Sequence, residues 1–339
     1  MRNRLRTVNI FAFITLGLFL AVSAVLAVFI LFFPQLAQQT ALQTLITYAV
    51  GFGLPALIYG LYIRAKEGQR LADTFSFHRL PLKSLLLCLA LGLLIQPIMS
   101  LVAALASLLF TDITTNSIEQ MSEMPLPLFV LTIGVLPAFF EELVCRGMLL
   151  DGYRDTPLWY MLLIPALFFG LLHLNFQQIS YAVVAGVILA YLVKITGSIW
   201  SSMTVHFVIN GTQSLLVWLM GHTALGDLLG QTGAGSGEAV TNGALGGALD
   251  EAASLLSENQ SGLAAVLSAA VMAGICLPFF LLCLYGLRRI HRFDEKKPAL
   301  LAGRPNWHQG SLLMYILMGL MLVMALLVEL LMPYLSELM

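Results

Sequence analysis

The sequence has little charge for its length. Only 10% of its 339 residues are Asp, Glu, Lys or Arg, whereas 59% are hydrophobic and the mean hydropathy is +0.89. Soluble domains carry about 25% charged residues, so this composition excludes an ordinary soluble protein. The formal net charge of −1 and the lack of a basic stripe give no indication of nucleic-acid binding. The composition predicts an integral membrane protein surrounded by the lipid bilayer.

Cysteine is also scarce. The chain has four cysteines, and they have neither CxxC spacing nor the spacing of metal ligands: Cys88, Cys145, Cys276 and Cys283. All four lie in apolar segments, where a thiol behaves as a small hydrophobic side chain. The sequence therefore assigns these cysteines to packing.

Apolar stretches of membrane-spanning length recur along the chain. A helix needs roughly 20 apolar residues to cross a bilayer. The candidate stretches are residues 8–33, 41–63, 84–110, 125–150, 157–174, 178–195, 199–221, 263–287 and 311–334. The first is longer than the apolar region of a signal peptide, about 7–15 residues, so we expect a retained helix. The fifth and sixth are short and form either two spans or a bent, re-entrant pair. We predict an all-α, polytopic transmembrane helical bundle with about nine spans.

Lys and Arg divide the loops into two kinds. The loops at 34–40, 111–124, 175–177 and 222–262 contain neither residue, whereas each alternate loop contains at least one. Cytoplasmic loops hold the excess of positive charge. We therefore predict a multi-pass protein of the cell membrane with a cytoplasmic N-terminus and an external C-terminus.

Four parts follow one another along the chain. Residues 1–124 hold the N-terminal transmembrane helices, and residues 125–221 hold spans four to seven with their polar residues. Residues 222–262 are rich in Gly, Ala and acid, which is typical of a flexible segment, here on the extracytoplasmic side. Residues 263–339 hold the C-terminal transmembrane helices. We predict that the second part is the functional core.

Charged residues stand inside the fourth span. Glu141 and Glu142 are adjacent there, and Arg146 follows one helical turn later. An ionisable residue at membrane depth costs about 2.5–3.5 kcal/mol on insertion scales, so its default interpretation is a functional site. Glu142 and Arg146 share a helix face and are predicted to pair. Glu141 is rotated by about 100° from Glu142 and is predicted to face the histidines of neighbouring spans.

Three further polar residues stand in these neighbouring spans. His173 ends the fifth span, and His206 and Asn210 share a face of the seventh. Imidazoles suit Zn²⁺, which in catalytic sites has three protein ligands and an open position for water. A carboxylate beside that water acts as a general base, and an amide stabilises a developing oxyanion. A transmembrane histidine alone is more often a packing residue, but the combination predicts a hydrolytic centre.

Three motifs in this part resemble those of a known family. EELVCR (Glu141–Arg146) resembles E-E-x-x-x-R, FGLLH (Phe169–His173) resembles F-x-x-x-H, and HFVIN (His206–Asn210) resembles H-x-x-x-N. In this order, and within membrane spans, they resemble the CPBP family of intramembrane proteases. That family includes CAAX proteases, bacteriocin-processing enzymes and the Rce1-like type II prenyl endopeptidases. One departure is Cys145, where an aromatic residue is common.

The resemblance implies an activity and roles for the residues. It implies a glutamate-dependent intramembrane metalloendopeptidase with a four-helix core in spans four to seven. Its substrates would be membrane-associated proteins or peptides, in CAAX-type or bacteriocin- and pheromone-type processing. Glu141 would activate water, supported by the Glu142–Arg146 pair. His173 and His206, together with Glu141, would hold Zn²⁺ or the water, and the amide of the last motif would stabilise the oxyanion.

Two other classes of protein stay open at this point. A non-catalytic membrane scaffold or immunity protein would keep the fold, but it has no need of Glu141. A proton-coupled transporter would use the buried acids as a relay, and the sequence has no evident inverted repeat of the kind found in many transporters. The predicted partners are a peptide or membrane-protein substrate and the bilayer.

Overall fold

Helices are the only regular secondary structure in the described part of the chain. A computed structural model describes residues 2–110, 118, 121–223, 261–293 and 308–338. Its elements are α1 (Arg2–Phe32), η1 (Pro34–Gln38), α2 (Thr40–Tyr48), η2 (Ala49–Gly53), α3 (Leu54–Glu67), α4 (Leu71–Thr74), α5 (Leu82–Leu94), α6 (Gln96–Ser107), α8 (Leu126–Val130), η3 (Leu131–Val135), α9 (Leu136–Glu142), η4 (Leu143–Leu149), α10 (Leu150–Gly152), α11 (Leu158–Leu171), α12 (Phe176–Thr196), α13 (Ile199–His222), α16 (Ser261–Ile290) and α18 (His308–Leu338). η1 is a 3₁₀ helix, whereas η2, η3 and η4 are π-helical turns. The predicted all-α fold is confirmed. The predicted loop at 222–262 lies outside the described residues, except at its ends.

Seven helical runs within the described residues are long and apolar enough to cross a membrane. They are Arg4–Phe32, Thr40–Glu67, Leu82–Ser107, Leu126–Gly152, Phe176–Thr196, Gly262–Ile290 and Leu312–Leu331. A bilayer offers the backbone no hydrogen-bond partners, and a helix satisfies its own. The chain is therefore a multi-pass helical membrane protein.

The nine predicted stretches are all helical, but two of them are not among these seven runs. α11 has 14 residues. At about 1.5 Å per residue it is roughly 21 Å long, against roughly 30 Å for a hydrocarbon core. α13 has 24 residues and is long enough, but polar residues such as Ser201, His206 and Asn210 lower its hydropathy. α11 is thus too short for a full crossing, whereas α12 is long enough, so the bent alternative predicted for the fifth and sixth stretches is left for α11 alone.

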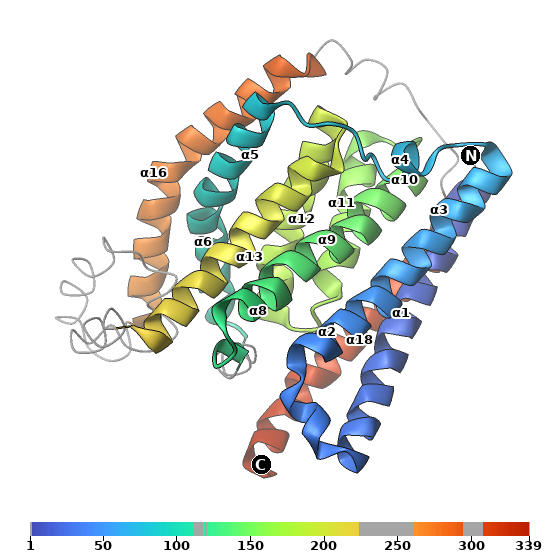
Figure 1. Cartoon of the computed structure of the whole chain (residues 1–339). Helices are drawn as coiled ribbons and strands as arrows, with labels where there is room; N and C mark the ends of the chain where they lie inside the picture. Colours follow the sequence, from blue (N-terminus) through green and yellow to red (C-terminus); the bar gives the residue numbers. More distant parts are fainter. Residues whose placement is uncertain (1, 111–117, 119–120, 224–260, 294–307, 339) are drawn as a thin grey trace.

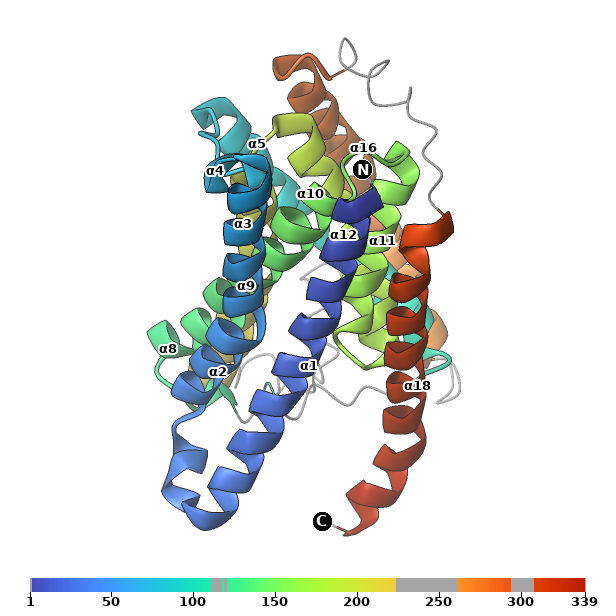
Figure 2. The same ribbon diagram turned by 90° about the vertical axis from the view of Figure 1, so that its right-hand side faces the viewer.

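The helices form three groups that lie side by side (Figure 1). α9, α11, α12 and α13 lie in the middle, with α5, α6 and α16 on one side and α1, α2, α3 and α18 on the other. α16 packs against α5 and α6, while α18 packs against α1 and α11. Figure 2 shows α1 and α18 next to each other, with the two chain ends at opposite ends of the bundle. The two C-terminal helices therefore flank opposite sides of the middle group.

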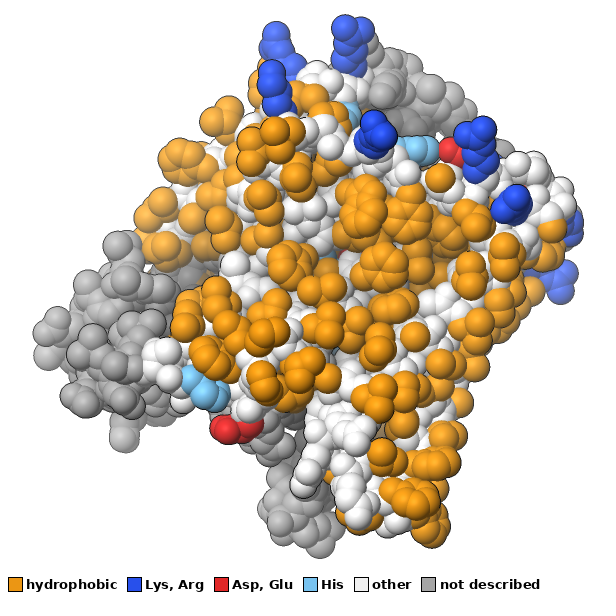
Figure 3. All heavy atoms as spheres, in the orientation of Figure 1, with side chains coloured by type: hydrophobic (Ala, Val, Ile, Leu, Met, Phe, Trp, Pro, Cys, Tyr) orange, Lys and Arg blue, Asp and Glu red, His pale blue; other side chains and the backbone are white. Residues whose placement is uncertain are grey.

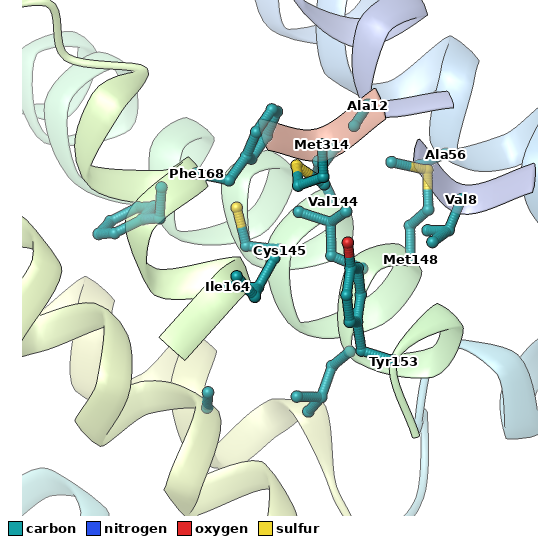
Figure 4. Close-up of a cluster of buried hydrophobic side chains, with 14 of the residues drawn as sticks. Val8, Ala12, Ala56, Val144, Cys145, Met148, Tyr153, Ile164, Phe168 and Met314 are labelled. Atoms are coloured by element: carbon teal, nitrogen blue, oxygen red, sulfur yellow. The ribbon is translucent and has the colours of Figure 1, made fainter. Parts of the chain in front are cut away.

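A buried apolar cluster joins the middle group to the N-terminal helices (Figure 4). Val144, Cys145 and Met148 of η4 are fully buried in it. The cluster also contains side chains of α1, α3, α11 and α18, among them Ala12 and Met314. Within a membrane, such close packing is a main source of helix association. Cys145 is a free thiol in this cluster, in agreement with the packing role predicted for it.

Glycine allows α11 and α12 to approach closely. A Cβ on Gly186 would lie 2.9 Å from the Cα of Ala166, and a Cβ on Gly170 would lie 2.4 Å from Cγ2 of Val183. Small residues at such contacts let the backbones of membrane helices meet. The close packing of α11 and α12 also places the carbonyl group of Gly186 within hydrogen-bond distance of Arg146.

Charged side chains gather at one end of the bundle. On the face drawn in Figure 3, Lys and Arg stand at one end of a broad hydrophobic band. In the same region, Arg4 donates hydrogen bonds to Asp151 and Glu67, and the hydroxyl group of Tyr59 donates to Oδ2 of Asp151 at 2.8 Å. The start of α1, the end of α3 and the end of α10 therefore meet. This meeting is the arrangement expected from the alternation of positively charged loops.

Candidate active site

The segment that carries the buried acids alternates α-helical and π-helical turns. η3 precedes α9, which ends with Glu141 and Glu142, and η4 follows with Arg146. π-helical turns are rare and occur frequently at functional sites. All three charged residues are buried, with exposed fractions of 9% for Glu141, 0% for Glu142 and 1% for Arg146. The structure thus places three ionisable groups inside the bundle, as predicted.

Glu142 and Arg146 form the predicted ion pair. Nη1 of Arg146 donates to Oε1 of Glu142 at 2.8 Å, and Nη2 donates to the carbonyl oxygen of Gly186 at 3.0 Å. The guanidinium group also lies over the ring of Phe169, 4.5 Å from its centroid. Buried charges are tolerated when they are paired and hydrogen-bonded. Arg146 therefore holds η4 against α11 and α12.

His206 lies between the two glutamates. Its Nδ1 is 3.0 Å from Oε1 of Glu142, and its Nε2 is 3.8 Å from Oε2 of Glu141. Because a carboxylate accepts, the shorter contact assigns the imidazole proton to Nδ1 and leaves Nε2 as an acceptor. The distance of 3.8 Å is too long for a direct hydrogen bond. The sequence predicts that Glu141 faces the histidines, and the structure adds that Glu142 also contacts His206.

Asn210 lies one turn after His206, on the same face. Its Nδ2 donates to the carbonyl oxygen of Ile133 at 3.1 Å and lies 3.3 Å from Nε2 of His206. Pro137 has no N–H for the carbonyl group four residues before it, which is that of Ile133. The side-chain amide of Asn210 supplies a donor at this position. Asn210 therefore connects α13 to η3 and contacts the acceptor nitrogen of His206.

Glu141 has a partner that the sequence analysis missed. The hydroxyl group of Tyr48, at the end of α2, donates to Oε1 of Glu141 at 2.8 Å. The other oxygen, Oε2, is the one that faces His206. The only sequence signal for this contact is a phenol group inside an apolar span, and nothing in the sequence assigns it to Glu141. The carboxylate thus has one engaged oxygen and one oxygen that faces an imidazole ring.

His173 lies just beyond the end of α11. Its Nδ1 donates to the carbonyl oxygen of Phe169 at 2.9 Å, and its ring meets the ring of Phe169 edge-on at a centroid distance of 5.2 Å. His206 meets the same ring edge-on at 5.6 Å. Phe169, the first residue of the F-x-x-x-H motif, therefore packs against both imidazole rings. Phe169 joins His173 to the other predicted site residues, beneath the guanidinium group of Arg146.

The predicted zinc ligands do not form a metal-binding group in this arrangement. Within the described residues, no three or more His, Cys, Asp and Glu side chains lie close enough together to hold a metal ion. The acceptor nitrogen of His206 also lies against the amide of Asn210. A catalytic zinc ion needs three protein ligands, so the side chains as placed do not fit one. Zinc stays a prediction that depends on the family resemblance.

A pocket lies at the charged end of the bundle, beside the segment that carries the ion pair. Its volume is about 200 Å³, and Arg146 lines it together with Asp151, Arg154 and Lys194. The remaining wall comes from the segment around α4 and from the ends of α10 and α12. A polar pocket of this size has room for several water molecules. The side chain of Arg146 is itself buried, and neither Glu141 nor His206 is among the residues that line this pocket.

The fold and the site define a class of protein: a multi-pass helical membrane protein with a buried centre of carboxylate, guanidinium, imidazole and amide groups. Residues 123–212 match the sequence model of the family described as type II CAAX prenyl endopeptidase Rce1-like. The matched segment contains all six predicted site residues. The match confirms the predicted resemblance: this part of the chain is similar to the Rce1-like family. No curated protein and no solved structure gives a significant match to the chain.

Proposed function

We propose that the chain is an intramembrane endopeptidase that uses Glu141 to activate water for attack on a peptide bond. The observation that carries the proposal is the placement of Glu141, which is buried with one oxygen held by Tyr48 and the other facing His206. The match of residues 123–212 to an endopeptidase family supports the type of reaction. We propose membrane-associated proteins or peptides as substrates, because the acids lie within a membrane-spanning run.

The proposed reaction begins with a water molecule between Oε2 of Glu141 and the imidazole ring of His206. Glu141 accepts a proton from this water while the water oxygen attacks the carbonyl carbon of the peptide bond. The amide of Asn210, 3.3 Å from Nε2 of His206, turns to donate to the oxyanion. Glu141 then gives its proton to the leaving amine as the C–N bond breaks. The water is divided between the new carboxyl group and the new amine.

The ion pair supports this reaction by orienting His206. Oε1 of Glu142 accepts from Nδ1 of His206 at 3.0 Å and from Arg146 at 2.8 Å. A hydrogen bond at one imidazole nitrogen sets the tautomer and therefore the role of the other nitrogen. Nε2 of His206 then accepts a hydrogen bond from the attacking water. In this proposal Glu142 and Arg146 position a reacting group and take no proton themselves.

The pocket at the charged end supports access from that side of the membrane. The positive-inside rule assigns this end, with Arg154 and Lys194, to the cytoplasm. A substrate would then enter from the cytoplasm or from the inner leaflet. The family resemblance favours CAAX-type tails, and bacteriocin leaders and peptide pheromones are the other proposed substrates.

A cleavage assay tests the proposed function. The purified protein is incubated in detergent with a fluorogenic prenylated CAAX-type peptide and, separately, with a fluorogenic leader peptide. Cleavage of either peptide by the wild type and not by Glu141→Gln supports the proposal. Cleavage that is equal in the two preparations shows that Glu141 is not required and contradicts the proposal. A scaffold protein or a transporter cleaves neither peptide.

The zinc prediction has a separate test in the same assay. If zinc takes part, 1,10-phenanthroline removes most of the activity and added Zn²⁺ restores it, whereas the non-chelating isomer 1,7-phenanthroline has no effect. Elemental analysis of the purified protein should then find one zinc ion per chain. Full activity in a metal-free preparation would contradict the zinc prediction and would leave the proposed role of Glu141 intact.

The orientation of the site is tested by cysteine labelling. In a background without the four native cysteines, Arg70→Cys lies in the exposed turn after α3, and Gln38→Cys lies beyond the far end of α1. We expect a membrane-impermeant maleimide to label Arg70→Cys only in inside-out vesicles and Gln38→Cys only in right-side-out vesicles. The reverse pattern would place the pocket on the external side and remove the cytoplasmic-substrate proposal.

A further inference from the structure

We propose that Tyr48 is a positioning residue for Glu141, and this inference rests on the proposed function. The hydroxyl group of Tyr48 donates to Oε1 of Glu141 at 2.8 Å, although 93 residues separate the two. Tyr48 ends α2 and lies outside the family match at 123–212. The family motifs therefore assign no role to it. The hydrogen bond that orients the proposed base therefore comes from the N-terminal helices.

The ring of Tyr48 is held by its neighbours. It stacks on Phe140, the residue before Glu141, with ring centroids 6.1 Å apart and 20° between the planes. It also meets Phe52 at 5.3 Å. Phe140 fits there because Gly53 has no side chain, since a Cβ on Gly53 would lie 2.7 Å from Cε1 of Phe140. Both Phe52 and Gly53 belong to the π-helical turn η2, which begins directly after Tyr48. The hydroxyl group is thus placed before any substrate arrives.

The contact selects which oxygen of Glu141 acts on water. Tyr48 engages Oε1, so Oε2 faces Nε2 of His206 at 3.8 Å. A phenol hydroxyl donates a hydrogen bond to a carboxylate without adding a charge to the site. Without it, the carboxylate is free to turn about its last bond, and a displacement of about 1 Å in a catalytic group can cost 10²-fold in rate. Tyr48 therefore fixes the direction of the base without touching the substrate.

Tyr59 provides a matched control on the same membrane-spanning run. Its hydroxyl group donates to Oδ2 of Asp151 at 2.8 Å, and both of these side chains are buried. Asp151 is not one of the residues placed in the reaction. Replacing either tyrosine by phenylalanine removes one hydrogen bond to a buried carboxylate and keeps the ring. A difference in catalysis between the two variants therefore reports on Glu141 and not on the general cost of losing such a bond.

The test compares the wild type, Tyr48→Phe and Tyr59→Phe in the cleavage assay, with thermal stability measured in parallel. For Tyr48→Phe we expect kcat to fall about 10- to 100-fold, within the range of misplaced or weakened general bases, while KM is unchanged. For Tyr59→Phe we expect kcat near the wild-type value and a similar or larger loss of melting temperature. Equal kcat values for the two variants would overturn the inference, while an active wild type and an inactive Glu141→Gln would still support the proposed function.

A second measurement tests Tyr48 even if no peptide is cleaved. Dicyclohexylcarbodiimide modifies carboxyl groups in membranes, and mass spectrometry of the peptide that contains Glu141 gives the rate. Because Tyr48→Phe releases Oε1 and lets the carboxylate turn, we expect this variant to be modified several times faster than the wild type, with Tyr59→Phe unchanged and Glu141→Gln unmodified at this position. Equal rates for Tyr48→Phe and the wild type would overturn the inference independently of enzyme activity.

Discussion

Glu141→Gln is expected to abolish peptide hydrolysis while the yield of folded protein stays close to that of the wild type. Glutamine has the shape of glutamate and keeps an oxygen that accepts from the hydroxyl group of Tyr48, so the contact at 2.8 Å survives. It does not accept the proton of a water molecule. General-base catalysis is typically worth about 10²–10⁴-fold in rate, so the variant should lose at least that much.

The matched control for this prediction is Glu329→Gln in α18. Glu329 is also a carboxylate within a membrane-spanning run, but it belongs to a helix outside the middle group. We expect Glu329→Gln to keep the wild-type kcat. The measurement is the initial rate of cleavage at saturating peptide, normalised to the monodisperse fraction in size-exclusion chromatography. Residual activity in Glu141→Gln near that of Glu329→Gln would remove Glu141 from the reaction.

Arg146→Ala is expected to lower the folded yield sharply. The change leaves the carboxylate of Glu142 buried without its cation and leaves the carbonyl group of Gly186 without this donor. It also removes the cation that lies over the ring of Phe169. Breaking a buried ion pair from one side typically costs about 3–5 kcal/mol, which is a large part of the stability of most proteins. The loss should appear as a lower melting temperature and as aggregation in detergent.

Arg154→Ala is the control for this second prediction. Arg154 lies two turns further along the same chain segment, and its side chain is 40% exposed while it contacts Asp151. Asp151 is buried, but without Arg154 it keeps its ion pair with Arg4 and the hydrogen bond from Tyr59, so this variant should melt near the wild-type temperature. The folded yield of Arg146→Ala is also compared with that of Glu141→Gln, which should stay near the wild-type yield. Equal folded yields for Arg146→Ala and Glu141→Gln would contradict the separation of a structural ion pair from a reacting carboxylate.

Periodicity and charge were sufficient to predict much of this site. Glu142 with Arg146, and His206 with Asn210, are each four residues apart, and both pairs are in contact in the structure. A spacing of four places two side chains on one helix face whatever the rest of the fold does. Likewise, the apolar stretches determined where helices form, because the bilayer leaves the backbone no alternative.

Periodicity and charge could not predict which helices that are distant in the sequence contact each other. A repeat of 3.6 residues tells which face of a helix a side chain occupies, but it does not tell which helix that face meets. The pairing of Tyr48 with Glu141 is of this kind. So is the role of Phe169 between two imidazole rings. The π-helical turns add to the difficulty, because each one rotates the residues that follow relative to a regular helix.

The buried cluster around η4 and the hydrogen bonds of Asp151 connect the family-matched segment to the first helix of the chain. Residues 123–212 match a family on their own. Yet Val144 is buried in one cluster with Val8, and Asp151 accepts hydrogen bonds from Arg4. The matched segment is therefore packed against the first helix as one unit. A substitution at Arg4 or Val8 is expected to lower the folded yield unless a residue within the matched segment is changed to fit it.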